Sequence, residues 1–166
     1  MPRSFDLMAE SSSTVEQVHR AYGDEKYWRA RLAATDNGTL RSLTVHEDGT
    51  VNMHATFSLL GEGLPKVVTQ LRHGDLDMVH HETWSWIDAD RLRGEVSVEL
   101  PGAPVSTRAA GLLTPVRDGS QLTCTATVAV RVPLVGGTIE GLIGGRLTTL
   151  IRDIHQFTTV WIADRG

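Results

Sequence analysis

The fold is decided by one continuous stretch, LTCTATVAVRV (122–132), PLVGG (133–137) and TIEGLIGGRLTTLIRDIHQFTTVWI (138–162). Apolar and polar residues alternate in the first segment, which is the period of an antiparallel strand with one buried face. After Gly137 the apolar period changes to 3.6 residues, which is the period of an amphipathic helix. The stretch therefore predicts a strand that leads into a long helix over 138–162.

The predicted helix carries an apolar stripe that we expect to face the sheet. At 100° per residue its members fall within about 60° of one another. They are Ile139, Ile143, Leu150, Ile154, Phe157 and Trp161, with Leu142 and Leu147 at the flanks. The residues expected on the opposite side are Gly141, Thr148, Arg152, His155 and Thr159. Gly144 and Gly145 weaken the helix, and they either allow another backbone to approach closely or permit the helix to fray.

Three pairs of alternating segments precede this helix, each joined by a short polar turn. In the first pair, a three-residue loop that ends with a left-handed Gly49 places the apolar residues of both strands on one face. The remaining signals predict a first strand and two short helices, with a further short helix or turn before the second pair. The predicted strands are 3–9, 40–46, 51–58, 76–87, 91–100, 106–116 and 120–132, and the predicted helices are 15–22, 24–34 and 64–71.

This order of elements predicts an α+β fold in which all hairpins are local. A curved antiparallel sheet of about seven strands wraps around the long C-terminal helix. Two short helices follow the first strand. Because no low-complexity linker divides the 166 residues, we expect residues 1–166 to form one domain.

Composition excludes several classes of protein. Hydrophobic residues make up 40% and charged residues 22%, as in globular proteins, and the net charge of -4 argues against nucleic-acid binding. The single cysteine, Cys124, cannot form an internal disulfide or a thiolate cluster. No segment has the character of a signal peptide or a membrane span. We expect a cytoplasmic protein without stable membrane insertion, present as a monomer or homodimer.

Several stretches of the chain resemble one protein family. They are PRSFD (2–6) with VEQV (15–18), ETW (82–84), GEV (94–96), PGAP (101–104) and VPLVGGTIE (132–140). Together they are similar to an actinobacterial family of START-like proteins of unknown function, within the helix-grip or SRPBCC superfamily. The resemblance implies the helix-grip fold and a cavity between sheet and helix that holds apolar molecules in relatives. The family itself implies no reaction or ligand.

The residues expected to contact such a ligand point from the strands and the helix toward this space. Trp84 and Trp86 share one strand face with Glu82, and paired tryptophans serve either as packing or as ligand contacts. The predicted ligand-binding residues are Met53, Phe57, Glu82, Trp84, Val96, Val98, Cys124, Ala126, Ile143, Arg146, Leu147, Leu150 and Ile154.

Two polar features have functional interpretations. His80 and Glu82 project from the same strand face, which suits a metal or an acid–base pair, but a third ligand is lacking because His54 is expected to point away. Arg146 lies on the apolar side of the helix and needs Glu82, an anionic ligand or water as its partner. No Gly-x-Ser-x-Gly elbow or phosphate-binding loop is found. We therefore assign no metal, cofactor or catalytic residue.

The leading functional hypothesis is the binding of a hydrophobic or amphipathic small molecule, such as a lipid, an isoprenoid or a polyketide-like compound. The first alternative is a cyclase or hydratase that uses His80, Glu82 and Arg146 on such a ligand. The second alternative is an interaction module whose cavity is filled by its own side chains.

Overall fold

A computed structural model describes residues 2–35, 38–58, 77–99, 101–102 and 104–165. The predicted helix or turn at 64–71 lies outside these residues. The elements are β1 (Arg3–Ser11), α1 (Val15–Tyr22), α2 (Glu25–Thr35), β2 (Thr39–Val45), β3 (Val51–Ser58), β4 (Asp77–Trp86), β5 (Leu92–Glu99), β6 (Val105–Val116), β7 (Gly119–Val130) and α4 (Gly136–Arg165).

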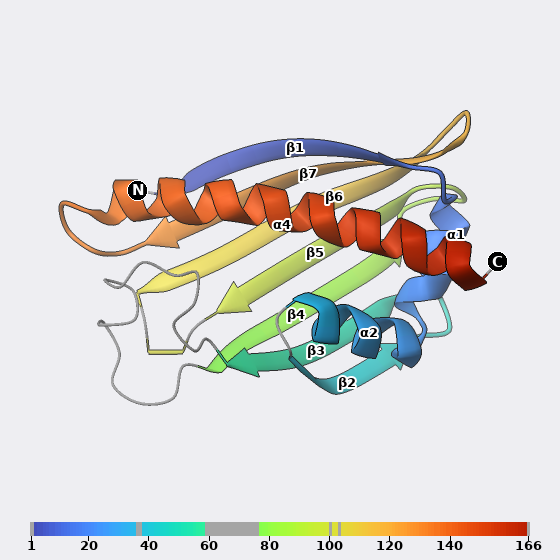
Figure 1. Ribbon diagram of the computed structural model, residues 1–166, viewed down its shortest axis with the longest axis horizontal. Coiled ribbons are helices and arrows are strands. Elements are labelled where there is room, and N and C mark those ends of the chain that lie inside the picture. Colours follow the sequence, from blue (N-terminus) through green and yellow to red (C-terminus); the bar gives the residue numbers. More distant parts are fainter. Residues whose placement is uncertain (1, 36–37, 59–76, 100, 103, 166) are drawn as a thin grey trace.

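The strands form a seven-stranded antiparallel sheet in the order β1-β7-β6-β5-β4-β3-β2. Sheet neighbours are consecutive strands in the sequence, except that the first strand, β1, pairs with the last, β7. Helix α4 crosses one face of the curved sheet, and α1 and α2 lie on the same side, with α2 beside β2 (Figure 1). The α+β helix-grip architecture expected from the sequence is confirmed.

The first hairpin has the predicted register. Its loop closes with a hydrogen bond of 2.8 Å from the His46 amide to the Thr50 carbonyl, and Gly49 has a φ of 88°. Leu43 therefore pairs with Met53 across the strands. His54 points to the other face of the sheet, where its ring stacks on His81 with 4.4 Å between centroids.

Helix α1 begins at a capping box and ends at Gly23. Thr14 and Gln17 form a capping box, with hydrogen bonds of 3.1 and 2.8 Å between each side chain and the other residue's amide. Gly23 follows the last turn and donates its amide to carbonyls of that turn. The short connection orients α2 across the sheet, which positions the polar residue Arg31 toward the interior.

Helix α4 spans Gly136–Arg165 and is longer than predicted, and its buried face is rotated from the expected one by roughly a quarter turn. The buried positions are Gly136, Ile139, Glu140, Gly144, His155 and Thr158. His155, expected on the solvent side, is only 3% exposed, whereas Leu150 of the predicted apolar stripe is 41% exposed. Contacts made far away in the sequence explain the rotation. The backbone at Gly144 lies against the Phe5 ring, and Tyr27 and Thr158 share a hydrogen bond of 2.6 Å.

Candidate functional site

Between the sheet and α4, the described residues line a cavity of about 110 Å³. Its floor consists of side chains from β4, β5, β6 and β7, and its cover comes from α4 with contributions from α1 and α2. The lining residues are Tyr22, Arg31, His80, Glu82, Trp84, Gly94, Val96, Val98, Thr107, Ala109, Gly111, Leu122, Cys124, Leu147, Leu150, Ile151, Ile154 and His155. Most of this surface is apolar, and its charged and titratable groups come from only a few residues.

A glycine on the floor, Gly94, makes room for the Trp84 ring. Gly94 and Gly111 pair with each other across β5 and β6, and Trp84 is the partner of Gly94 on β4. A Cβ at position 94 would lie 2.4 Å from Cζ3 of Trp84, which is closer than real contacts allow. The glycine that interrupts the apolar pattern of β5 therefore permits the indole to lie flat across the sheet.

The cavity contains a buried ion pair between α2 and β4. Nη2 of Arg31 lies 2.5 Å from Oε2 of Glu82, and the two residues are 6% and 2% exposed. The guanidinium also lies over the ring of Trp28, 4.5 Å from its centroid. Because each charge neutralises the other, the pair adds no net charge to the cavity.

His80 and Trp84 complete the hydrogen bonding of the Glu82 carboxylate. His80 Nε2 lies 2.8 Å from Oε2, and the Trp84 indole donates to Oε1 at 2.9 Å. Burial by itself raises the pKa of Glu82, but the charge of Arg31 and these hydrogen bonds outweigh it and lower the pKa to about 2. Glu82 is therefore an ionised acceptor at neutral pH, and it fixes the orientation of the His80 ring.

The pKa values of three other lining groups are shifted toward the neutral forms. Burial raises the pKa of the Tyr22 hydroxyl and of the Cys124 thiol, and it lowers the pKa of His155. The interior outside the Arg31–Glu82 pair thus favours uncharged groups.

The structure brings many of the predicted ligand-binding residues to this cavity. Those that line it are Glu82, Trp84, Val96, Val98, Cys124, Leu147, Leu150 and Ile154. The others lie outside the lining. Met53 and Ala126 are buried, Phe57 meets the His80 ring edge-on, Ile143 packs against the cluster around Val105, and Arg146 is exposed.

Arg146 has access to water, one of the three partners weighed for it, and does not pair with Glu82. It is exposed, because the rotation of α4 turns it away from the sheet, and Glu82 pairs with Arg31 instead. Sequence reasoning missed Arg31, Tyr22 and His155 as cavity residues. One available signal for Arg31 was its position on α2 next to apolar residues of the buried face.

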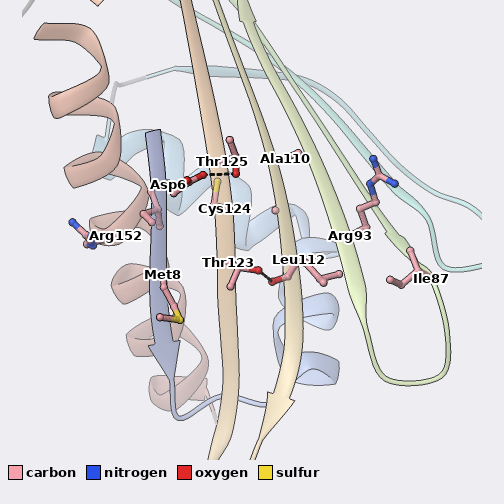
Figure 2. A pocket seen from close by; sticks show the side chains of 12 residues that line it. Asp6, Met8, Ile87, Arg93, Ala110, Leu112, Thr123, Cys124, Thr125 and Arg152 are labelled. Atoms are coloured by element: carbon pink, nitrogen blue, oxygen red, sulfur yellow. Dashed lines mark hydrogen bonds between the residues drawn. The ribbon is translucent and has the colours of Figure 1, made fainter. Parts of the chain in front are cut away.

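A larger hollow of about 870 Å³ lies on the outer face of the sheet and is a different kind of feature (Figure 2). Strand residues such as Asp6, Met8, Leu112 and Thr123 surround it, and the side chains of Asp6 and Thr125 share a hydrogen bond of 2.7 Å. It is open to solvent, and Met8 is 57% exposed. We therefore place the candidate site in the smaller cavity under α4, where the buried polar groups converge.

Two further observations concern the part of the chain that the structure describes. None of its helices combines the length and the apolar character that crossing a bilayer requires. Within the same residues, no three histidine, cysteine, aspartate or glutamate side chains come together as a metal-binding group.

Sequence comparison places the chain in a family. Residues 6–162 match the model of a family described as a protein of unknown function, DUF2505. The chain belongs to the DUF2505 family. An uncharacterised protein of Mycobacterium tuberculosis is 38% identical to this DUF2505 protein, over 99% of both chains. The expected resemblance to an actinobacterial START-like family of unknown function is thereby confirmed.

Solved structures similar to this DUF2505 protein share its fold. The Zhui aromatase/cyclase from Streptomyces sp. R1128 is 9% identical with a TM-score of 0.62, over 99% of this chain and 96% of that one. Ara h 8.0201 is also 9% identical, with a TM-score of 0.58 over 99% of both chains. At this identity the likeness shows the START-like fold alone.

Proposed function

We propose that this DUF2505 protein binds a hydrophobic or amphipathic small molecule in the cavity between the sheet and α4. The observation that carries the proposal is the largely apolar space under α4 with one buried polar group of Arg31, Glu82 and His80 at its wall. Binding sites for small molecules typically combine an apolar lining with a few fixed polar groups. Lipid, isoprenoid and polyketide-like compounds have the matching chemistry.

The size of the cavity limits how such a ligand is held. An apolar cavity of about 150 Å³ in another protein holds benzene, so about 110 Å³ suits a single ring or the end of a chain. Leu150 both lines the cavity and is 41% exposed, which supports an opening beside this residue. A longer ligand would extend past Leu150 to the surface.

The test is to purify the protein from its own host, extract the bound small molecules and identify them by mass spectrometry. Ala109→Phe places a ring on the cavity floor, because Ala109 lies between Val96 and Ala126 of the neighbouring strands. Its neighbour Ala110 is exposed on the outer face, so Ala110→Phe is a matched control. We expect the wild type and Ala110→Phe to carry the same apolar compound and Ala109→Phe to lose it. The absence of any compound from the wild type would favour an interaction module with a filled cavity.

Acid–base chemistry on the bound molecule is a second candidate function. The observation that favours it is the orientation of the His80 ring by Glu82, since a carboxylate that holds one ring nitrogen leaves the other directed for proton transfer. Turnover of the extracted compound by the wild type but not by His80→Gln would support an enzyme. Unchanged compound in both cases would support binding alone.

A further inference from the structure

Two histidine nitrogens in the cavity have no hydrogen-bond partner among the described protein atoms. They are Nδ1 of His80, in β4, and Nε2 of His155, in α4, and the two residues are 8% and 3% exposed. Both residues line the cavity, one from the sheet floor and one from the helix that covers it. Burying such a group without a partner costs about 1–3 kcal/mol, so native structures rarely tolerate it without a reason.

The other buried polar atoms without a partner do not belong to this cavity. Among the described residues they are Oε1 of Glu140 and Nε1 of Trp161, and neither residue is part of the lining. Unpartnered nitrogens on both its sheet floor and its helix cover therefore distinguish this cavity from the rest of the described interior.

The hydrogen bond to Glu82 determines what His80 offers to a ligand. The ionised carboxylate of Glu82 can only accept, so the proton in the 2.8 Å contact belongs to Nε2 of His80. In the neutral ring, Nδ1 is then an acceptor. A ligand group that satisfies it must carry a hydrogen to donate.

The charges in the cavity argue against an anionic ligand. Arg31 is the only arginine or lysine among the described lining residues, and Glu82 already holds its guanidinium at 2.5 Å. A carboxylate near His80 would lie close to Glu82 and would have no hydrogen for Nδ1. Burial of such an uncompensated charge is strongly unfavourable.

We propose that the ligand is an uncharged, ring-sized alcohol or phenol whose hydroxyl group lies between His80 and His155. A hydroxyl donates to Nδ1 of His80, and its oxygen lone pairs and rotatable hydrogen let it accept from or donate to Nε2 of His155. The ring occupies the apolar part of the cavity. This inference rests on the proposed function and names the chemical class that the same site selects.

The experiment compares three probes of similar size, phenol, toluene and benzoate, in NMR titrations of the full chain at neutral pH. Toluene has the shape of phenol without the hydroxyl, and benzoate replaces the hydroxyl with a charge. We expect phenol to bind about tenfold more tightly than toluene, which corresponds to two modest hydrogen bonds, and benzoate to bind at least about tenfold more weakly than phenol. The ¹⁵N resonance of His80 Nδ1 should shift with phenol and not with toluene.

Two variants and one control test whether the preference for phenol over toluene depends on the histidines. His155→Leu leaves the Arg31–Glu82–His80 network in place and should weaken phenol about fivefold without weakening toluene. His80→Leu should also weaken phenol binding about fivefold without weakening toluene binding, provided that its amide spectrum shows an intact fold. His54→Leu alters a histidine on the outer face and should change neither affinity.

The outcomes separate this inference from the proposed function. Toluene binding as tightly as phenol, benzoate binding as tightly as phenol, or an unchanged phenol preference in His155→Leu would overturn the hydroxyl assignment while leaving an apolar binding site. Failure of all three probes to bind would overturn both.

Discussion

Arg31 and Glu82 form an ion pair in the interior although 51 residues separate them in the sequence, with 2.5 Å between Nη2 and Oε2. Their side chains are only 7% and 1% exposed. The pair joins α2 to β4 and therefore holds the helix layer against the strand that carries His80. Removal of one member leaves the other as an unpaired buried charge, which is far more costly than loss of a surface ion pair.

Arg31→Met should lower the free energy of unfolding by about 3–5 kcal/mol, because it strands the Glu82 carboxylate. The double variant Arg31→Met/Glu82→Gln should recover part of this loss. Arg29→Met is the matched control on the same helix, since Arg29 pairs with exposed Glu25, and it should cost less than about 1 kcal/mol. Urea midpoints with unchanged slopes measure all three. Equal effects of the Arg31 and Arg29 substitutions would contradict a buried pair.

Acid should destabilise the protein through Glu82. The pKa of this group is about 2 in the folded protein and 4.5 as the ordinary value, so its stabilising contribution is present above pH 4.5 and declines as the pH falls toward 2. The shift corresponds to roughly 3 kcal/mol. Urea unfolding between pH 2.5 and 6 should show a steeper decline for the wild type than for Arg31→Met/Glu82→Gln. Parallel curves would show that Glu82 is not held ionised.

Alanine substitutions at two adjacent glycines of α4 should change the stability of the protein in opposite directions. A Cβ at Gly144 would meet the Phe5 ring, with its nearest atom 2.1 Å away, whereas nothing lies within 4 Å of a Cβ at Gly145. Gly145→Ala should therefore stabilise the helix by up to about 1 kcal/mol. Gly144→Ala should destabilise the protein by about 1–3 kcal/mol because Phe5 must move. Thermal or urea unfolding of the two variants measures these changes. A gain in stability from both substitutions would contradict the close contact between Gly144 and Phe5.

Truncation along α4 should reveal which of its apolar residues are packed. Ile139 is 3% exposed and belongs to a cluster with Val105, Val128 and Val130, so Ile139→Ala should cost about 2–5 kcal/mol. Leu150 is 41% exposed beside the cavity, and Leu150→Ala should cost less than about 1 kcal/mol. Similar large losses at both positions would indicate that the predicted apolar stripe, rather than the observed face, is buried.

Local patterns were sufficient to predict most of the architecture. The period of two in 122–132, the change to 3.6 after Gly137 and the loop ending at Gly49 each depend on neighbouring residues alone. They predicted the strands, the long helix and the register of the first hairpin. The same alternation correctly placed His80, Glu82 and Trp84 on one strand face, where they share hydrogen bonds.

The orientation of α4 and the partner of Glu82 were decided only by tertiary contacts. A helical period gives the mean direction of apolar residues, but the side that meets a sheet also depends on where the backbone can approach closely and where polar groups find partners. Gly144 fits against Phe5, and Thr158 finds Tyr27, so the helix turns His155 inward and Arg146 outward. With Arg146 outside, the nearest available cation for Glu82 is Arg31, brought there by the packing of α2 against the sheet.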